Sequence, residues 1–271
     1  MGRRRPTYDD RALPVPVPLN LQRIRIILVE PQEPGNIGAT ARAMKTMGLT
    51  GLTLVRPAPF AESKEATYMA HRAGEVLAAA QVTETLEEAL KEVHYLVGTT
   101  HRRRSRVLPQ VVPVREVAAR IAVVSQNHTV GVLFGREDRG LPVSVLSRCH
   151  LCATIPAASR EPSLNLAQAV MVVAYEIFLA SLGQPPPLPL DLPTVGEVEY
   201  LVQRLVNLLV RLGFRPYVND PETFRQSVRR VFGRATLERR DIATLHEICQ
   251  TIEGVLARRT EGTPPQSPSE D

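Results

Sequence analysis

Several kinds of residue are scarce in this 271-residue chain. Tryptophan is absent and aromatic residues make up 4% of the sequence, which argues against a broad surface for stacking nucleobases. Three cysteines are too few for the disulfide framework of a small secreted protein. No stretch of about 20 residues is free of polar groups, and the basic N-terminus lacks the apolar segment of a signal peptide. We therefore expect a cytoplasmic protein that does not enter a membrane.

Lysine is also scarce, so arginine carries nearly all of the positive charge. The chain has 33 basic residues against 28 acidic ones, a formal net charge of +5, and only Lys45, Lys64 and Lys91 are lysines. This balance is typical of a protein that binds a polyanion, and equally of an ordinary solvated basic surface. Hydrophobic residues form 44% of the sequence, which is enough to bury a core in one large domain or two smaller ones.

Hydrophobic patterning predicts an α/β domain over residues 22–182. Strands are expected at 23–29, 52–55, 94–97, 129–134 and 151–155, and helices at 36–47, 65–80, 86–93, 114–121, 143–147 and 165–180. Strands separated by helical crossovers imply a parallel sheet covered on both faces.

The segments outside this domain are predicted from their composition. Residues 1–21 lack periodicity and indicate a flexible basic arm. Prolines in 183–192 indicate a linker. Helices expected at 195–212, 221–232 and 237–257 form a helical domain over 193–259, and 260–271 is a polar tail.

Candidate site residues lie in the loops after the strands, because open parallel sheets bind ligands beyond the carboxyl ends of their strands. After the first strand, Gly35 and the expected N-cap Asn36 would leave backbone N–H groups free for an anion. Arg42 lies nearly two turns further along the same helix and can share a face with Asn36. A capped helix with a surface arginine would produce the same pattern.

The later loops carry similar signals. Four arginines within residues 102–106 would repel one another unless an anion binds there. Ser163 and Asn165 flank the start of a helix, which ordinary N-capping also explains. Cys149 and Cys152 resemble half of a zinc site, but no second pair is present, so no metal is expected.

Together, these loops resemble the motifs of the SpoU branch of the SPOUT RNA methyltransferases. Residues 36–42, with the sequence Asn-Ile-Gly-Ala-x-Ala-Arg, resemble the first motif. Residues 134–141 are similar to the second, and Ile155-Pro156 with residues 163–170 to the third. The motifs occur in order at strand ends. The residues of these motifs and the presence of the helical domain most resemble the subfamily that methylates a tRNA ribose in the anticodon loop, at nucleotide 32.

The resemblance implies a SPOUT-type α/β fold with a trefoil knot near the C-terminal end of the sheet. It also implies a homodimer whose sites take residues from both chains, with S-adenosyl-L-methionine bound in the knot. The cofactor-binding residues implied by position are Thr99, Thr100, His101, Gly135, Ile155, Pro162, Ser163 and Leu164.

In the reaction that the resemblance implies, a ribose 2′-hydroxyl attacks the sulfonium methyl group. Arg42 matches the central catalytic arginine, and because arginine stays protonated we expect it to stabilise oxyanion charge and to grip phosphate. Ser163 would position the hydroxyl or relay its proton. Asn36, Glu137 and Asn165 would hold the site geometry.

Binding of tRNA would come from arginines that contact phosphates without reading sequence. Those next to the cofactor loop are Arg102, Arg103, Arg104 and Arg106, and those in the helical domain are Arg225, Arg229, Arg230, Arg234, Arg239 and Arg240. The alternatives are a ribosomal RNA 2′-O-methyltransferase and a non-catalytic RNA-binding protein.

Overall fold

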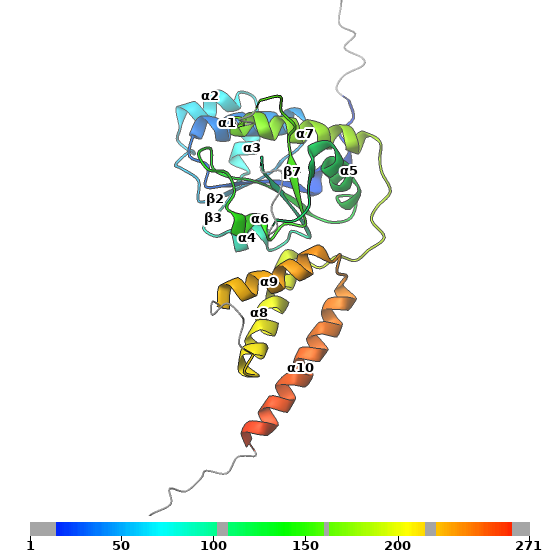
Figure 1. The fold of residues 1–271 in the computed structure, drawn as a ribbon. Helices are drawn as coiled ribbons and strands as arrows, with labels where there is room; N and C mark the ends of the chain where they lie inside the picture. Colours follow the sequence, from blue (N-terminus) through cyan, green and yellow to red (C-terminus); the bar gives the residue numbers. More distant parts are fainter. Residues whose placement is uncertain (1–14, 102–107, 160–162, 215–220, 262–271) are drawn as a thin grey trace, which may run out of the picture.

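A seven-stranded sheet forms the centre of the larger domain (Figure 1). The structure is a computed structural model that describes residues 15–101, 108–159, 163–214 and 221–261. The strands are β1 (Ile24–Val29), β2 (Gly51–Val55), β3 (Gln81–Thr83), β4 (Tyr95–Thr99), β5 (Val111–Pro113), β6 (Val130–Phe134) and β7 (Leu151–Thr154). Their order across the sheet is β3-β2-β1-β6-β4-β7-β5, and every neighbouring pair is parallel.

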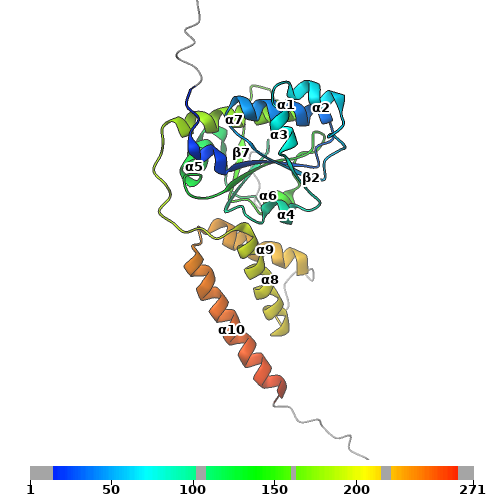
Figure 2. The same ribbon diagram turned by 180° about the vertical axis from the view of Figure 1, so that it is seen from behind.

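Helices cover both faces of the sheet, as Figures 1 and 2 show. On β1, Ile26 and Leu28 join one core cluster while Ile27 and Val29 join the other, because alternate side chains of a strand point to opposite faces. The first face packs against α1 (Pro34–Thr46), α3 (Gly74–Ala78), α5 (Val114–Val124) and α7 (Leu166–Leu182). The second packs against α4 (Leu86–Leu90) and α6 (Val143–Leu146). The predicted α/β class with a parallel sheet is confirmed.

Some predicted elements differ locally from the observed ones. The helix expected at 65–80 is divided into α2 (Lys64–Ala70) and α3, because His71 takes a left-handed backbone with φ of 52° that ends the first helix. β3 and β5 have three residues each, too few for an alternating pattern to indicate a strand. Helix α1 begins at Pro34, which suits the first turn of a helix, so the prediction that Asn36 is its N-cap is wrong.

Ordered packing starts before residue 22. The 3₁₀ helix η2 (Leu19–Arg23) buries Asn20 and Leu21. The Asn20 amide donates to the hydroxyl oxygens of Ser125 at 2.8 Å and Ser181 at 3.0 Å. The prediction of a flexible arm is therefore wrong for its last residues, where the buried Asn20 amide binds the chain to the residue that follows α5 and to α7.

The helical domain consists of α8 (Val195–Arg211), α9 (Pro221–Arg234) and α10 (Arg239–Glu261). A capping box between Thr194 and Glu197 starts α8, and apolar residues of α8 and α10 pack together. The domain adjoins the amino ends of the strands, where the Val195 N–H donates to the Val93 carbonyl at 2.7 Å. Among the described residues, no helix is both long and apolar enough to cross a bilayer.

The trefoil knot stays a prediction. The segments 102–107 and 160–162, which follow β4 and β7, lie outside the described residues.

Candidate active site

A cavity of about 430 Å³ opens at the carboxyl ends of β4, β6 and β7. Its volume is in the range of pockets that hold a small molecule or a cofactor. Seven of the eight predicted cofactor residues line it: Thr99, Thr100, His101, Gly135, Ile155, Ser163 and Leu164. Pro162, the eighth, lies outside the described residues. The structure thus places three strand-end loops, far apart in sequence, around one space.

Hydrogen bonds between neighbouring strand ends fix the walls of this cavity. The Thr99 hydroxyl donates to the Leu133 carbonyl at 2.9 Å, and the Thr100 N–H donates to the Ala153 carbonyl at 2.9 Å. These bonds tie the end of β4 to both neighbouring strands. A Cβ atom at Gly135 would collide with the backbone of Gly140 and Leu141, so glycine there allows the loop after β6 to fold back on itself.

Three of the predicted catalytic residues form one chain of hydrogen bonds. The Asn36 amide donates to Glu137 Oε1 at 3.0 Å, and the Asn165 amide donates to Asn36 Oδ1 at 2.8 Å. Asn165 Oδ1 in turn accepts from the backbone N–H groups of Ala167 at 3.0 Å and Gln168 at 3.4 Å, and so caps α7. The first, second and third motifs therefore meet through side chains.

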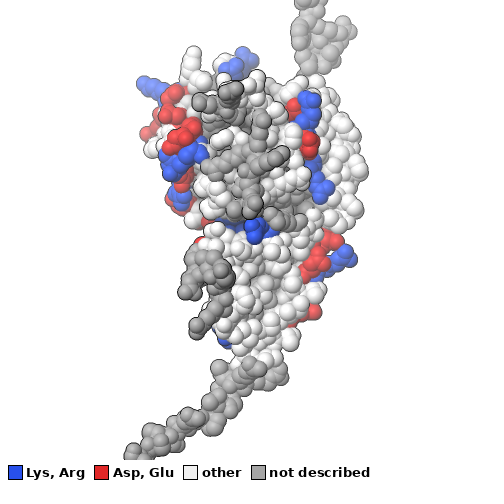
Figure 3. All heavy atoms as spheres, viewed as in Figure 1, with Lys and Arg blue, Asp and Glu red and all other residues white. Residues whose placement is uncertain are grey.

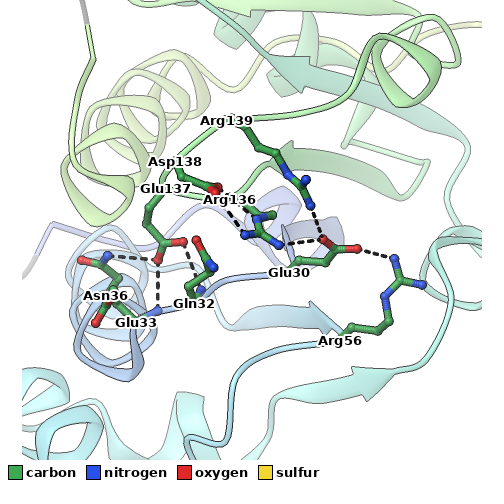
Figure 4. A network of polar contacts seen from close by, with 9 residues as sticks. All are labelled: Glu30, Gln32, Glu33, Asn36, Arg56, Arg136, Glu137, Asp138 and Arg139. Atoms are coloured by element: carbon green, nitrogen blue, oxygen red, sulfur yellow. Dashed lines mark hydrogen bonds and ion pairs between the residues drawn. The ribbon is translucent and has the colours of Figure 1, made fainter.

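Glu137 also accepts backbone hydrogen bonds from the loop after β1 (Figure 4). Its carboxylate receives the Gln32 N–H at 3.0 Å and the Glu33 N–H at 3.3 Å. These donors precede α1, and the Asn36 N–H, which was predicted to be free for an anion, donates instead to the Glu33 carbonyl at 3.0 Å. An acceptor-only group with three donors is well satisfied, which holds the two loops in a fixed relation.

A second carboxylate joins the same two loops, but this one, Glu30, comes from the loop after β1 and accepts from the loop after β6 (Figure 4). It accepts from Arg136 Nη1 at 3.5 Å, from Arg139 Nη2 at 3.3 Å and from Arg56. The hydrogen bond from Arg56 is the largest cause that lowers the pKa of Glu30 below its ordinary value. Asp138 accepts from Arg136 Nε and Nη2 at 3.0 Å each.

Glu30 and Arg56 also belong to the site, although none of the sequence motifs indicated them. Each is the first residue after a strand, β1 and β2 respectively. A charged residue directly after a buried parallel strand is the signal that could have found them.

Arg42 is exposed on α1 and is not among the described residues that line the cavity. Its carbonyl accepts from the Thr46 hydroxyl at 2.8 Å, within the helix. The structure therefore separates Arg42 from the cavity of its own chain, unlike Asn36, Glu137 and Asn165.

The predicted RNA-binding arginines have varied surroundings. Arg102, Arg103, Arg104 and Arg106 lie outside the described residues. Arg229 is 7% exposed and pairs with Glu199, so its predicted contact with phosphate is wrong. Arg225, Arg239 and Arg240 lie at the surface, where each pairs with an acidic neighbour.

The cysteine pair is part of the core. Cys149 and Cys152 are free, buried thiols, and burial raises the pKa of both, that of Cys152 to about 12. Among the described residues, no group of three His, Cys, Asp or Glu side chains is placed to hold a metal ion.

The cavity with its three joined motifs defines a class of enzyme. The chain belongs to the SpoU rRNA Methylase family, whose model matches residues 23–175, and it is a methyltransferase. The resemblance drawn from the motifs is confirmed.

The particular relatives that it matches are tRNA (cytidine/uridine-2′-O-)-methyltransferases named TrmJ. The chain is 37% identical to that of Pectobacterium atrosepticum over 238 residues, covering 86% of this chain and 98% of the relative. It is 39% identical to that of Klebsiella pneumoniae over 241 residues, covering 86% and 97%. The crystal structure of TrmJ from Z. mobilis superposes with a TM-score of 0.74 and 31% identity, covering 84% of this chain and 98% of that one.

Proposed function

We propose that this protein transfers a methyl group from S-adenosylmethionine to a ribose 2′-hydroxyl of tRNA, at nucleotide 32 of the anticodon loop. The observation that carries the proposal is the extent of the similarity. Identity to the tRNA 2′-O-methyltransferases covers 86% of the chain, whereas the family model ends at residue 175. The helical domain therefore belongs to the part that is shared with enzymes acting on tRNA.

The cavity fits S-adenosylmethionine in size and in chemistry. Ile155, Leu164 and Leu166 give it an apolar wall for an adenine ring, and Thr99 and Thr100 bring polar groups from the carboxyl end of the neighbouring strand β4. Acidic and basic side chains at the rim, including Glu137 and Arg139, suit a ligand that carries both signs of charge. When bound, this cofactor supplies an electrophilic methyl group on a sulfonium.

The chain's own residues would orient the ribose and stabilise the charge that develops on its oxygen. Ser163 is exposed and lines the cavity, where it can hold the 2′-hydroxyl. Arg42 stays protonated and is suited to stabilise oxyanion charge. Because Arg42 does not line the cavity of its own chain, we place it against the cavity of a second copy in a homodimer. Glu137, Asn36 and Asn165 act as positioning residues.

Binding of tRNA would combine the helical domain with the basic loop that follows the cofactor-binding residues. Arg102, Arg103, Arg104 and Arg106 follow His101 directly, and His101 lines the cavity. Phosphates near the target nucleotide would therefore come within reach of these arginines.

Methylation of unmodified tRNA with labelled S-adenosylmethionine tests the proposal, followed by digestion to nucleosides and mapping of the label. We expect label on one ribose, at nucleotide 32. Label on a base, or transfer to ribosomal RNA but not to tRNA, would contradict the proposed function, and absence of transfer to either RNA would indicate a binding protein.

A further inference from the structure

Three guanidinium groups gather around Glu30 at the carboxyl edge of the sheet (Figure 4). They lie outside the hydrogen-bonded chain of Asn36, Glu137 and Asn165. Arg56 comes from the end of β2, and Arg136 and Arg139 come from the loop after β6. Glu30 is the carboxylate that all three share. The cluster therefore joins three separate chain segments at one point.

The backbone directs two of these side chains to the same place. In the parallel register, Val29 is paired with Val55, so Glu30 and Arg56 are the next residues on adjacent strands. Both take the left-handed conformation, with φ of 52° and 45°, which is costly for residues other than glycine. The Glu30 N–H donates to the Val55 carbonyl at 2.8 Å and the Arg56 N–H to the Thr83 carbonyl at 3.0 Å. Strain of this kind is concentrated at functional sites.

The charges of the cluster do not cancel. Three arginines face two carboxylates, Glu30 and Asp138, so 3 − 2 leaves a net charge of +1. Asp138 engages Arg136 through two nitrogens and fixes it within the loop. Arg139 and Arg56 remain 63% and 55% exposed at their side chains, and each guanidinium has five N–H donors. Donors thus remain that can face solvent or a bound anion.

Arg139 places the cluster at the edge of the cavity, whose lining it joins. A ribose presented to the cavity brings its flanking phosphates with it, because each nucleotide is joined to the next through phosphate. We propose that Arg139 and Arg56 form a phosphate-binding site for the substrate RNA at the mouth of the cavity, with Glu30 orienting both guanidiniums. The inference rests on the proposed function, since it requires an RNA substrate.

This site differs in kind from the basic loop at 102–106. Guanidinium groups held by a carboxylate are pre-organised, so they lose little side-chain entropy when they bind a phosphate. We therefore expect a local contact that positions the backbone next to the target ribose, in addition to general attraction.

The test compares Arg56→Gln, Arg139→Gln and the double variant with the wild type. The dissociation constant of tRNA is measured over a salt series, and that of S-adenosylmethionine by calorimetry. We expect the double variant to bind tRNA roughly tenfold more weakly, with a salt slope smaller by roughly 0.7 for each phosphate that is no longer neutralised, and to bind the cofactor unchanged. The double Arg→Lys variant should recover the slope, because it keeps the charge.

Arg25→Gln is the matched control, since Arg25 pairs with a single glutamate, Glu92, near the amino end of β1. It should leave the affinity for tRNA and the salt slope unchanged. A salt slope in the double Gln variant equal to that of the wild type would overturn the proposed site. So would a loss of cofactor affinity equal to the loss of tRNA affinity. If the wild type methylates tRNA in the same preparation, either result leaves the proposed function standing, whereas a wild type without transfer activity contradicts that function.

Discussion

At the residue scale, two charged side chains of the family motifs have opposite surroundings. Glu137 is partly buried and accepts three hydrogen bonds from one loop and its helix. Arg42 is exposed on α1, away from the cavity of its own chain. A carboxylate that is fully engaged within the protein is suited to hold shape, and an exposed cation is suited to contact a substrate.

Replacement of Arg42 separates catalysis from cofactor binding. Arg42→Ala should lower the rate of methyl transfer by about 100-fold or more, because it removes the cation that we propose stabilises the developing oxyanion charge. The affinity for S-adenosylmethionine should stay within a few-fold, and calorimetry measures it. Lys45→Ala, one turn further along α1, is the control and should retain activity. An equal loss of cofactor affinity in the arginine variant would show that Arg42 binds the cofactor instead.

A partly buried histidine, His150, makes stability depend on pH. Burial lowers the pKa of His150 from 6.5 to about 4, and its Nδ1 accepts from the Leu96 N–H at 3.0 Å. Between these pH values the unfolded chain binds a proton that the native protein does not, so stability falls as the pH drops from about 6.5 towards 4.

Urea unfolding at pH 7 and pH 5 tests this dependence. On lowering the pH, the wild type should lose up to about 2 kcal/mol more than His150→Asn, because asparagine keeps an acceptor but does not titrate. Equal losses in both proteins would mean that His150 titrates normally in the native state.

At the scale of elements, the loops after β1 and β6 are joined by two carboxylates, one from each loop. Glu30 follows β1 and accepts from arginines of the loop after β6, while Glu137 follows β6 and accepts from the loop after β1. Each loop therefore supplies a carboxylate that accepts hydrogen bonds from the other loop. The neighbouring strands β1 and β6 are thereby joined beyond their last paired residues, Leu28 and Phe134.

Glu137→Gln tests this junction. Glutamine offers one acceptor oxygen, and its amide would face backbone donors that now have a carboxylate partner. We expect a loss of about 1–3 kcal/mol in the free energy of unfolding and a slower transfer rate with unchanged tRNA affinity. Urea unfolding and initial rates measure both. Glu116→Gln, an exposed carboxylate on α5, should change neither. A fully stable Glu137 variant would contradict a joining role.

The elements of the α/β domain could largely be predicted, because a buried strand such as β6 leaves a continuous apolar run and an amphipathic helix such as α5 leaves a periodic pattern. Most of the residues that line the cavity could also be predicted, because they lie in the motifs and at the ends of the strands. The contact of Asn36 with Asn165 could not be predicted from spacing, because it joins residues 129 positions apart. The buried pairing of Arg229 depends on α9 meeting α8, and local sequence does not show such packing.

At the scale of the whole molecule, an ion pair between two largely buried side chains, Arg148 and Glu199, joins the two domains. Glu199 of α8 contacts Arg229 of α9 and lies 3.6 Å from Nε of Arg148, in the larger domain. Arg148 also pairs with Glu87 at 2.5 Å. The face seen in Figure 3 shows few charged side chains on the helical domain. Part of the charge of the helical domain, on Glu199 and Arg229, is used for its own packing and for its attachment to the larger domain.

Glu199→Gln should weaken this attachment. The Arg229 side chain, 8% exposed, would keep its charge without a carboxylate partner, at a cost of about 3 kcal/mol in the free energy of unfolding. Urea unfolding measures the loss, and proteolysis within residues 183–192 should become faster. Glu222→Gln at the surface of α9 is the control. Unchanged stability and proteolysis would mean that the domains are held by other contacts.

The length of the sheet strands sets the distance between the cavity and the helical domain. The cavity lies at the carboxyl ends of the strands, whereas Val195 of the helical domain is bonded to Val93, just before β4 begins. β4 has five residues, and a strand of that length spans about 17 Å. If the substrate is tRNA as proposed, an isolated anticodon hairpin and a complete tRNA would thus differ in how far they extend from the cavity towards the helical domain. The length of the RNA, more than its nucleotide sequence, then decides whether it contacts only the cavity or both the cavity and the helical domain.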